Sequence, residues 1–344
     1  MNYMEVLPDG YTWSSYEPTK ENCIIIADFL SNNYVEDKMN KFRLCYSSDF
    51  IHWYLNSTTS INVVIMDNMN MVGFISGRKI TMKLKDRIED TAEIDFLCLQ
   101  KKNRNNKLCP LLIKEITRQF NNIGIYEAIY TSTHMYQNLL STVNYFIRPI
   151  NIKYLVEIDF LKATTHPDNL ERMYMLPKVK PGNKSLLLLT NDNCDDYINQ
   201  CMTLYNKYMS KFECYEIINL TLFKKMLIND HIKCYVLLEN NKVLDFISYY
   251  IFNTIVVRHN KNMRDGYMYL YTNTSDHLHK MLLMFLHTLK DNKIDSFLAL
   301  DIMENEDDMY EDLNFVKESS DFYYFLFKDT NLKITNKKLA KIIF

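Results

Sequence analysis

A short basic loop between two apolar patterns holds the residues best suited to chemistry. Arg104 and Lys107 lie in the polar run Asn-Arg-Asn-Asn-Lys. Apolar and acidic residues alternate over residues 92–98, which predicts a strand, and apolar residues at helical spacing over residues 108–120 predict a helix. Because free N–H groups at a helix start attract anions, this arrangement predicts a phosphate site. An ordinary connection with solvated lysines is the main alternative, since the loop has no glycine.

The composition is that of a folded globular protein. The chain has 344 residues, of which 47% are hydrophobic and 24% charged, enough for one large core or two domain-sized ones. The net charge of −2 argues against nucleic acid or an anionic membrane as the partner. No apolar run is long enough to predict a membrane-spanning helix.

The cysteines and histidines do not form a metal-binding pattern. Eight cysteines occur without a Cys-x-x-Cys pair, and the eight histidines include no His-Glu-x-x-His motif. In a chain of this size we expect buried free thiols, a reducing compartment and a cytoplasmic location.

Periodicity and turn signals predict a β-rich chain with several helices. We expect helices around residues 24–30, 50–55, 108–120, 139–146, 195–212 and 277–290. Strands are expected at residues 61–66, 71–77, 82–85, 92–99, 125–131, 154–160, 186–189, 233–239, 244–255, 267–272, 297–300 and 322–327. Clustered prolines predict a connector over residues 162–185.

The stretch around the basic loop resembles the first signature of the N-myristoyltransferases. From Glu93 it reads Glu-Ile-Asp-Phe-Leu-Cys-Leu-Gln-Lys-Lys, then Asn-Arg-Asn-Asn-Lys-Leu-Cys-Pro. The family signature reads Glu-Ile-Asn-Phe-Leu-Cys-Val-His-Lys-Lys-Leu-Arg-Ser-Lys-Arg-Val-Ala-Pro. Other matches are Leu-Pro-Asp-Gly-Tyr-Thr-Trp from Leu7, Tyr-Val-Glu-Asp from Tyr34, and Phe-Leu-Ala-Leu-Asp-Ile-Met-Glu-Asn from Phe297. The resemblance covers nearly the whole chain, which is identified as a divergent, short member.

The resemblance implies an α+β fold with two N-acyltransferase (GNAT)-like halves. They would share a large saddle-shaped mixed sheet surrounded by helices. Residues 1–165 would form the acyl-CoA-binding half, and residues 166–344 the peptide-binding half including the catalytic C-terminus.

The implied reaction transfers myristate from myristoyl-CoA to the α-amine of an N-terminal glycine. The amine attacks the thioester directly, and the main-chain N–H groups of Phe96 and Leu97 would hold the oxyanion. Successive N–H groups of a regular strand point in opposite directions, so we predict a β-bulge at these two residues.

A base must also remove a proton from the glycine amine, which is mostly protonated at neutral pH. By resemblance the base is the C-terminal carboxylate, here that of Phe344. Asp95, where the family has Asn, would lie on the proton route together with Thr131 and Tyr46.

The resemblance further implies residues that bind the two substrates. The coenzyme contacts would be Phe96, Leu97, Cys98, Leu99, Arg104, Asn105, Lys107, Leu108, Cys109 and Tyr34. The peptide contacts would be Val35, Asp37, Phe42, Leu44, Tyr46, Tyr145, Ser248 and Asp301. The implied co-substrate is myristoyl-CoA, with no prosthetic group and no metal. We expect a monomer that acts on glycine-ended peptides or nascent proteins.

Two departures from the family keep other functions open. Ile147 stands where the family has a peptide-contacting His, and residues 314–320 carry none of the glycines of the second signature, Lys-Phe-Gly-x-Gly-Asp-Gly. We therefore expect a differently shaped substrate-binding loop. One alternative is an inactive relative that binds acyl-CoA or glycine-ended peptides. The other is an N-acyltransferase with a different acyl chain or acceptor.

Overall fold

The computed structural model describes residues 4–34, 40–180, 182–275, 277–329 and 331–343. The chain forms two compact units, each assembled from separate stretches of sequence. The first unit contains the described residues up to Leu140, with Tyr323–Lys333 and Ile343, and the second contains Ser141–Phe322 and Ile334–Ile342. The predicted division of acyl-CoA and peptide binding at residue 165 concerns function and stays a prediction.

A mixed sheet forms the first unit. Its strands lie in the order β1-β3-β4-β5-β6-β14. Neighbours are antiparallel except β5 and β6, which are parallel and are joined through helix α3. The strands are β1 (Tyr11–Ser15), β2 (Phe42–Cys45), β3 (Ser60–Asp67), β4 (Asn70–Leu84), β5 (Arg87–Leu99), β6 (Glu127–Ser132) and, from Tyr323 onward, β14 (Val316–Phe327). The helices are α1 (Lys20–Asn33), α2 (Ser48–Leu55), α3 (Leu108–Asn122) and the short 3-10 helix η1 (Lys101–Asn103).

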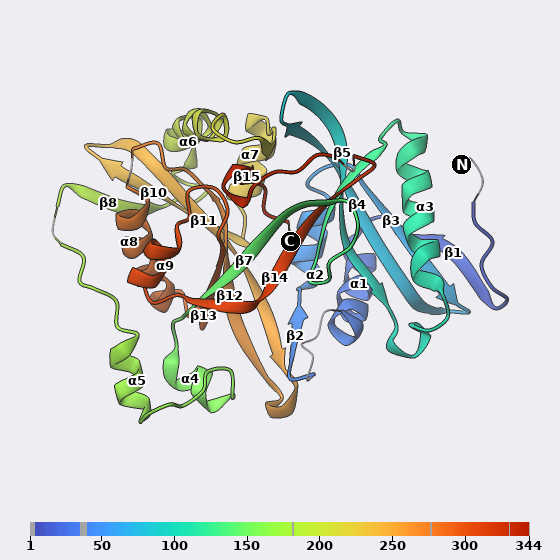
Figure 1. The fold of residues 1–344 in the computed structure, drawn as a ribbon, viewed down its shortest axis with the longest axis horizontal. Coiled ribbons are helices and arrows are strands. Elements are labelled where there is room, and N and C mark those ends of the chain that lie inside the picture. The colour runs from blue at the N-terminus through green and yellow to red at the C-terminus, as the bar shows by residue number, and fades with distance from the viewer. Residues whose placement is uncertain (1–3, 35–39, 181, 276, 330, 344) are drawn as a thin grey trace. The chain divides into compact units, whose positions relative to one another are not determined.

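Helix α3 packs along one face of this sheet, beside β3, β4 and β5 (Figure 1). Its buried face includes Leu112, Ile116 and Phe120, which join a core of strand residues such as Ile65 and Ile75. Gly77 permits the close approach of helix and sheet, because a Cβ there would lie 2.4 Å from the Phe120 ring. The amphipathic spacing read from the sequence therefore buries the face that it predicts.

The strands of the second unit lie in the order β7-β13-β12-β11-β10-β8. Its strands are β7 (Leu139–Pro149, from Ser141 onward), β8 (Lys184–Leu188), β9 (Cys214–Glu216), β10 (Ile232–Glu239), β11 (Lys242–Val256), β12 (Lys261–Tyr271), β13 (Ser296–Leu300) and β15 (Leu339–Ala340). The helices are α4 (Ile152–Glu157), α5 (Pro167–Met173), α6 (Cys194–Met209), α7 (Leu220–Leu227), α8 (Leu278–Asp291) and α9 (Asp307–Asp312), with 3-10 turns η2 (Val257–His259) and η3 (Asn336–Lys338).

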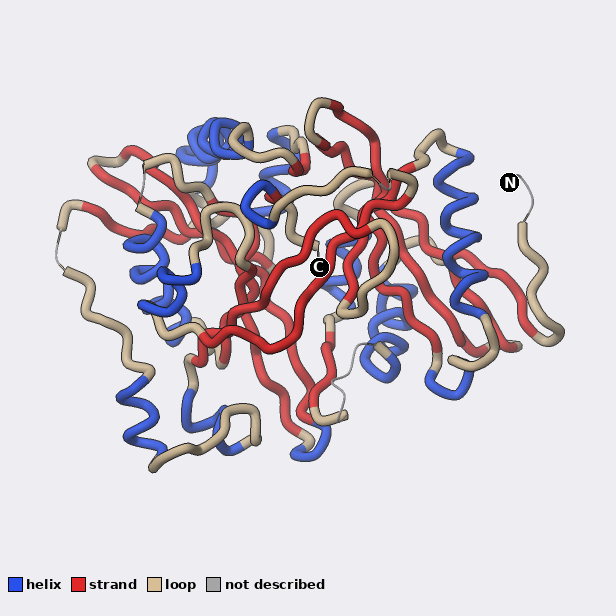
Figure 2. Tube along the Cα trace, in the orientation of Figure 1, coloured by secondary structure: helices blue, strands red, loops and turns tan. Residues whose placement is uncertain are grey.

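The two units repeat one plan. Three successive antiparallel strands are followed by a helix and by a strand parallel to the third: β3-β4-β5-α3-β6 in the first unit and β10-β11-β12-α8-β13 in the second. Figure 2 shows each of these helices in blue against the red strands of its own unit. The α+β class and the N-acyltransferase-like arrangement of each unit are confirmed.

Two of the predicted elements are wrong, and they err in opposite directions. Residues 139–146, predicted as a helix, belong to strand β7. A strand was predicted at residues 154–160, but residues 154–157 belong to helix α4. In β7 the buried Leu140, Val143 and Phe146 are spaced by three, which imitates a helix. Antiparallel pairing of β7 with β13 overrides that spacing.

Candidate active site

Strand β5 carries an irregularity at the predicted position. Cys98 is opposite Phe74 of β4, whereas Asp95 is opposite Ser76, so β5 has one extra residue at Phe96 and Leu97. Phe96 has φ of 57°, a left-handed conformation that is costly for a bulky side chain. The predicted β-bulge is confirmed. It breaks the alternation of N–H directions at the two residues for which the resemblance predicts contact with the oxyanion.

Aromatic rings fix this strained residue in place. The Phe96 side chain is fully buried, and its ring lies 5.9 Å from that of Tyr34, 5.5 Å from that of Tyr46 and 5.6 Å from that of Tyr54. Leu97, in contrast, is 37% exposed. The bulge therefore has one side chain anchored in the core and the next one facing outward.

The parallel pairing of β5 with β6 covers Thr91 to Glu93, and so it ends before the bulge.

Burial raises the pKa of Tyr34 well above its usual value, with further contributions from Tyr46, Asp95 and Cys98. A hydrogen bond from the Phe96 backbone opposes these effects. Tyr34 is therefore an uncharged phenol beside the main chain of the bulge.

The basic loop leads directly into the start of α3. Lys107 is the N-cap, with φ of 56°, and its side chain makes no capping hydrogen bond. Arg104, Asn105 and Lys107 are exposed, whereas Leu108 is buried. A helix start of this kind presents main-chain donors to an anion.

Side chains from other segments hold this loop. The Tyr11 hydroxyl accepts hydrogen bonds from Asn103 Nδ2 at 3.0 Å and from Asn106 Nδ2 at 2.9 Å. Arg104 donates to the Asn33 carbonyl at the end of α1, at 2.7 Å. The loop is thus attached to both β1 and α1.

A buried charged cluster lies next to the bulge, and most of its members were not predicted from the sequence. Arg78 of β4 pairs with Glu93 of β5 at 2.9 Å, and its guanidinium lies 4.0 Å from the centre of the Tyr54 ring. The Tyr54 hydroxyl contacts both Glu93, at 3.1 Å, and Asp95. Arg78 and Glu93 each interrupt an otherwise apolar strand pattern. Because charged side chains are seldom buried unless they are paired, this pattern could have predicted their ion pair.

Two domain models of one protein family match this chain. Residues 2–143 match the model of the myristoyl-CoA:protein N-myristoyltransferase N-terminal domain, and residues 157–341 match that of the C-terminal domain. The chain belongs to the N-myristoyltransferase family. Members of this family are acyltransferases, and that class applies to this chain.

Individual relatives agree with the family match. The chain is 34% identical over 333 residues to glycylpeptide N-tetradecanoyltransferase of Plasmodium falciparum, covering 93% of this chain and 80% of that enzyme. It is 29% identical to glycylpeptide N-tetradecanoyltransferase 2 of Bos taurus, covering 93% and 66%. A crystal structure of Saccharomyces cerevisiae N-myristoyltransferase with bound myristoyl-CoA superposes with a TM-score of 0.85 at 27% identity, covering 95% of this chain and 85% of that one.

The remaining first-unit residues implied by the resemblance lie in strands or at their ends, except Cys109, which lies in helix α3. Thr131 is half-buried in β6, where it pairs with Tyr324 of β14. Phe42 and Leu44 lie in β2, and Tyr46, just beyond it, stacks on Phe50 at 5.0 Å. Cys98 and Leu99 are buried at the end of β5, and Cys109 is half-buried in the first turn of α3.

Three peptide-contact residues predicted from the N-myristoyltransferase resemblance lie in the second unit. Ser248 is fully buried, donating to the Leu270 carbonyl at 2.7 Å and accepting from the Leu270 N–H at 3.0 Å. Asp301 is 3% exposed and accepts two hydrogen bonds from Asn144. Tyr145 packs on Phe322, with 4.7 Å between ring centres. These contacts join residues of the second unit to one another. The predicted contacts with peptide stay predictions.

Three other predicted residues, Val35, Asp37 and Phe344, lie outside the described residues. The segment that corresponds to the second N-myristoyltransferase signature extends into strand β14, which begins at Val316. No helix in the described part of the chain is both long and apolar enough to cross a membrane.

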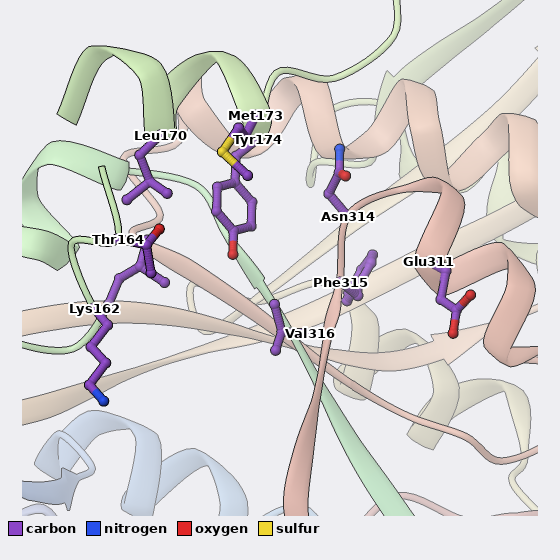
Figure 3. A pocket seen from close by; sticks show the side chains of 10 residues that line it. Lys162, Thr164, Leu170, Met173, Tyr174, Glu311, Asn314, Phe315 and Val316 are labelled. Atoms are coloured by element: carbon purple, nitrogen blue, oxygen red, sulfur yellow. The ribbon is translucent and has the colours of Figure 1, made fainter. Parts of the chain in front are cut away.

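A groove of about 420 Å³ in the second unit contains none of the predicted site residues. It lies between the connector around α5 and residues 311–316 (Figure 3). Leu170 and Met173 line one side, Phe315 and Val316 line another, and the Tyr174 ring points toward Val316. The groove does not contribute to the candidate active site.

Proposed function

We propose that this chain transfers myristate from myristoyl-CoA to the α-amine of an N-terminal glycine. The bulge at Phe96 and Leu97, followed by a basic loop and a helix start without a side-chain cap, is the observation that carries the proposal. One strand and the helix after it would thereby supply both an oxyanion site and a phosphate site.

The bulge supports catalysis because acyl transfer needs preorganised hydrogen-bond donors. When the amine attacks the thioester carbonyl, negative charge develops on the carbonyl oxygen. Main-chain N–H groups of Phe96 and Leu97 would receive that charge, and the buried Phe96 ring holds the strand in place. Removing a single donor from such a site typically costs about 10²–10³ in rate.

The loop and helix start support coenzyme binding. Main-chain N–H groups of Lys107, Leu108 and Cys109 would meet the phosphates of coenzyme A, with the Arg104 and Lys107 charges nearby. The proposed contacts thus combine a helix dipole with two exposed cations.

The amine loses two protons during amide formation. One accompanies the thiolate of the departing coenzyme, and the other must pass to a base. We propose that Asp95, Thr131 and Tyr46 form the route for this second proton. The Phe344 carboxylate is the proposed base by resemblance alone, because Phe344 lies outside the described residues.

The test compares a peptide that begins with glycine with the same peptide beginning with alanine. We expect coenzyme A release from myristoyl-CoA with the first peptide and at least about a tenfold slower release with the second, since an added methyl group would clash near the amine. Tight binding of myristoyl-CoA without turnover would instead support an inactive acyl-CoA-binding relative. Faster turnover with acetyl-CoA would support an N-acyltransferase of another specificity.

A further inference from the structure

A buried ion pair lies near the end of the described chain. Lys341 Nζ donates to Glu216 Oε2 at 2.5 Å, and the two residues are 4% and 3% exposed. Glu216 ends strand β9, and Lys341 directly follows β15, which pairs with β9 in parallel. The pair therefore joins two segments of the second unit that lie 125 residues apart in the sequence.

Stability alone accounts poorly for this pair. Moving a carboxylate and an ammonium group out of water is costly, and apolar side chains of similar size often stabilise a fold equally well. In the described part of the chain, the other carboxylate oxygen of Glu216, Oε1, is buried without a hydrogen-bond partner. Part of the desolvation of Glu216 is therefore uncompensated. Specifying one arrangement among several is the best attested role of such a buried charge pair.

The sequence around Lys341 shows which arrangement the pair can specify. Residues 339–344 read Leu-Ala-Lys-Ile-Ile-Phe, so Lys341 is the one charged side chain in an apolar tail. Strand β15 contributes only Leu339–Ala340 to the pairing with β9. Apolar contacts specify so short a register weakly, because one aliphatic residue can take the place of another. A slip would leave Glu216 buried beside an apolar residue, so the ion pair selects one register.

Other polar contacts hold the tail, but farther from its end. The Glu213 N–H donates to the Lys338 carbonyl at 3.0 Å, and Asn336 Nδ2 donates to the Asp301 carbonyl at 3.0 Å. Lys341 is the polar side chain closest to the chain end. Three extended residues span at most about 11 Å, so the position of Lys341 limits where a group at the chain end can lie.

We propose that Glu216 and Lys341 are positioning residues: their ion pair sets the register of the tail and so places the terminal carboxylate for proton transfer. This rests on the proposed function, in which the Phe344 carboxylate is the base. A slip of one residue would shift the carboxylate by about 3.3 Å along the strand direction. Because proton transfer requires hydrogen-bond reach, a shift of that size would take the base out of range.

The main test replaces both members of the pair by apolar residues, as Glu216→Leu with Lys341→Met. Both charges of the pair are then gone, so thermal unfolding should occur close to the wild-type temperature. The tail is then wholly apolar, and its register is no longer selected. We expect kcat with a glycine-ended peptide to fall about tenfold or more, while the Kd for myristoyl-CoA without peptide changes less than about twofold. Wild-type kcat would overturn the proposal.

Single substitutions of Glu216 keep Lys341 and all its other contacts, and so they assign the effect to the pair. Glu216→Leu should lower kcat at least as much as the double variant does. Glu216→Gln keeps an oxygen that accepts a hydrogen bond, and we expect it to retain kcat within about threefold. The matched control is Lys338→Met, an exposed lysine of the same tail that donates to the Lys211 carbonyl, and it should behave as wild type. Wild-type kcat in Glu216→Leu would contradict the proposal.

Extension of the chain by a few residues after Phe344 shows whether the pair acts through the chain end. Extension should already displace the terminal carboxylate. Adding Glu216→Leu with Lys341→Met to the extended protein should therefore change kcat less than about twofold, whereas independent effects would multiply. Losses that multiply would indicate a general structural role and would overturn the proposal.

Wild-type and extended proteins separate the possible failures. If wild type releases no coenzyme A with the glycine-ended peptide, the proposed function fails. If wild type turns over and extension has no effect, the terminal carboxylate is not the base, and the role of the ion pair fails with it. If extension lowers kcat but the double variant does not, only the role of Glu216 and Lys341 fails.

Discussion

Tyr11 contacts the loop that contains the proposed phosphate site. Its hydroxyl accepts hydrogen bonds from the amides of Asn103 and Asn106, one on each side of Arg104. The loop would otherwise pay the full ordering entropy when coenzyme binds. Tyr11 thus preorganises a loop that it does not belong to.

We expect Tyr11→Phe to raise KM for myristoyl-CoA about three- to tenfold while kcat changes less than about twofold. The physical reason is the loss of two hydrogen bonds that order the loop, each contributing on the order of 1 kcal/mol. Steady-state kinetics with saturating peptide measures both constants. Tyr16→Phe, close by in the chain, is the control, and an unchanged KM would show that the loop is ordered by other contacts.

Two corresponding elements, one in each unit, show why chemistry is assigned to the first. In the second unit β12 also has an extra residue relative to β11, at Tyr269 and Leu270. There, however, the Ser248 hydroxyl bonds to both main-chain groups of Leu270. The Asp245 carboxylate accepts from the N–H groups of Thr274 and Ser275, before α8. In the second unit, internal side chains thus occupy the positions that correspond to the bulge of β5 and the start of α3.

A second buried carboxylate gives strand β12 a pH-dependent stability. Asp265 is 1% exposed and accepts hydrogen bonds from Thr254 at 2.6 Å and Ser296 at 2.5 Å. Burial raises its pKa to about 7; the two hydroxyls oppose this, and nearby Asp295 adds to it. The pKa of this carboxyl group is higher in the folded than in the unfolded state. At pH values where the unfolded chain has lost the proton, this difference lowers the free energy of unfolding.

We therefore expect the free energy of unfolding to fall as pH rises from about 4 to about 7, by on the order of 4 kcal/mol, and to level off above that range. Below about pH 4 the group is protonated in both states and has no effect. Asp265→Asn should remove this slope, because an amide keeps hydrogen-bonding capacity without charge. Urea unfolding at several pH values measures the effect; an identical slope in the variant would contradict it.

At the scale of the whole molecule, the described chain ends in a buried segment. Strand β15 pairs with β9, Lys341 forms a buried ion pair with Glu216, and Ile342 and Ile343 are 5% and 4% exposed. Residues 339–343 are therefore held by strand pairing, an ion pair and apolar burial together. The role of the Phe344 carboxylate remains a proposal.

We expect a few residues added after Phe344 to lower kcat by at least about 10²-fold, because the carboxylate would move away from the proton route. Myristoyl-CoA should still stabilise the extended protein, by about 2.7 kcal/mol at 100 times its Kd. Turnover assays and thermal unfolding with and without ligand measure the two effects. Full activity after extension would overturn the proposed role of the Phe344 carboxylate.

The sequence alone was sufficient for features that depend on local chemistry. The order of most strands and helices, the buried face of α3 and the bulge at Phe96 and Leu97 follow from periodicity and from a resemblance carried by short motifs. The strands and helices could be predicted because periodicity depends on neighbouring residues and their spacing, whereas the bulge was predicted from the resemblance.

Only the tertiary structure decided features that join distant residues. Pairing with β13 made residues 139–149 a strand against their helical spacing. Tyr54, Arg78 and Asp95 lie far apart in the sequence, and Tyr11 precedes its loop partners by about ninety residues. Their proximity results from the register of β4 and β5 and the packing of α2, which no local pattern encodes.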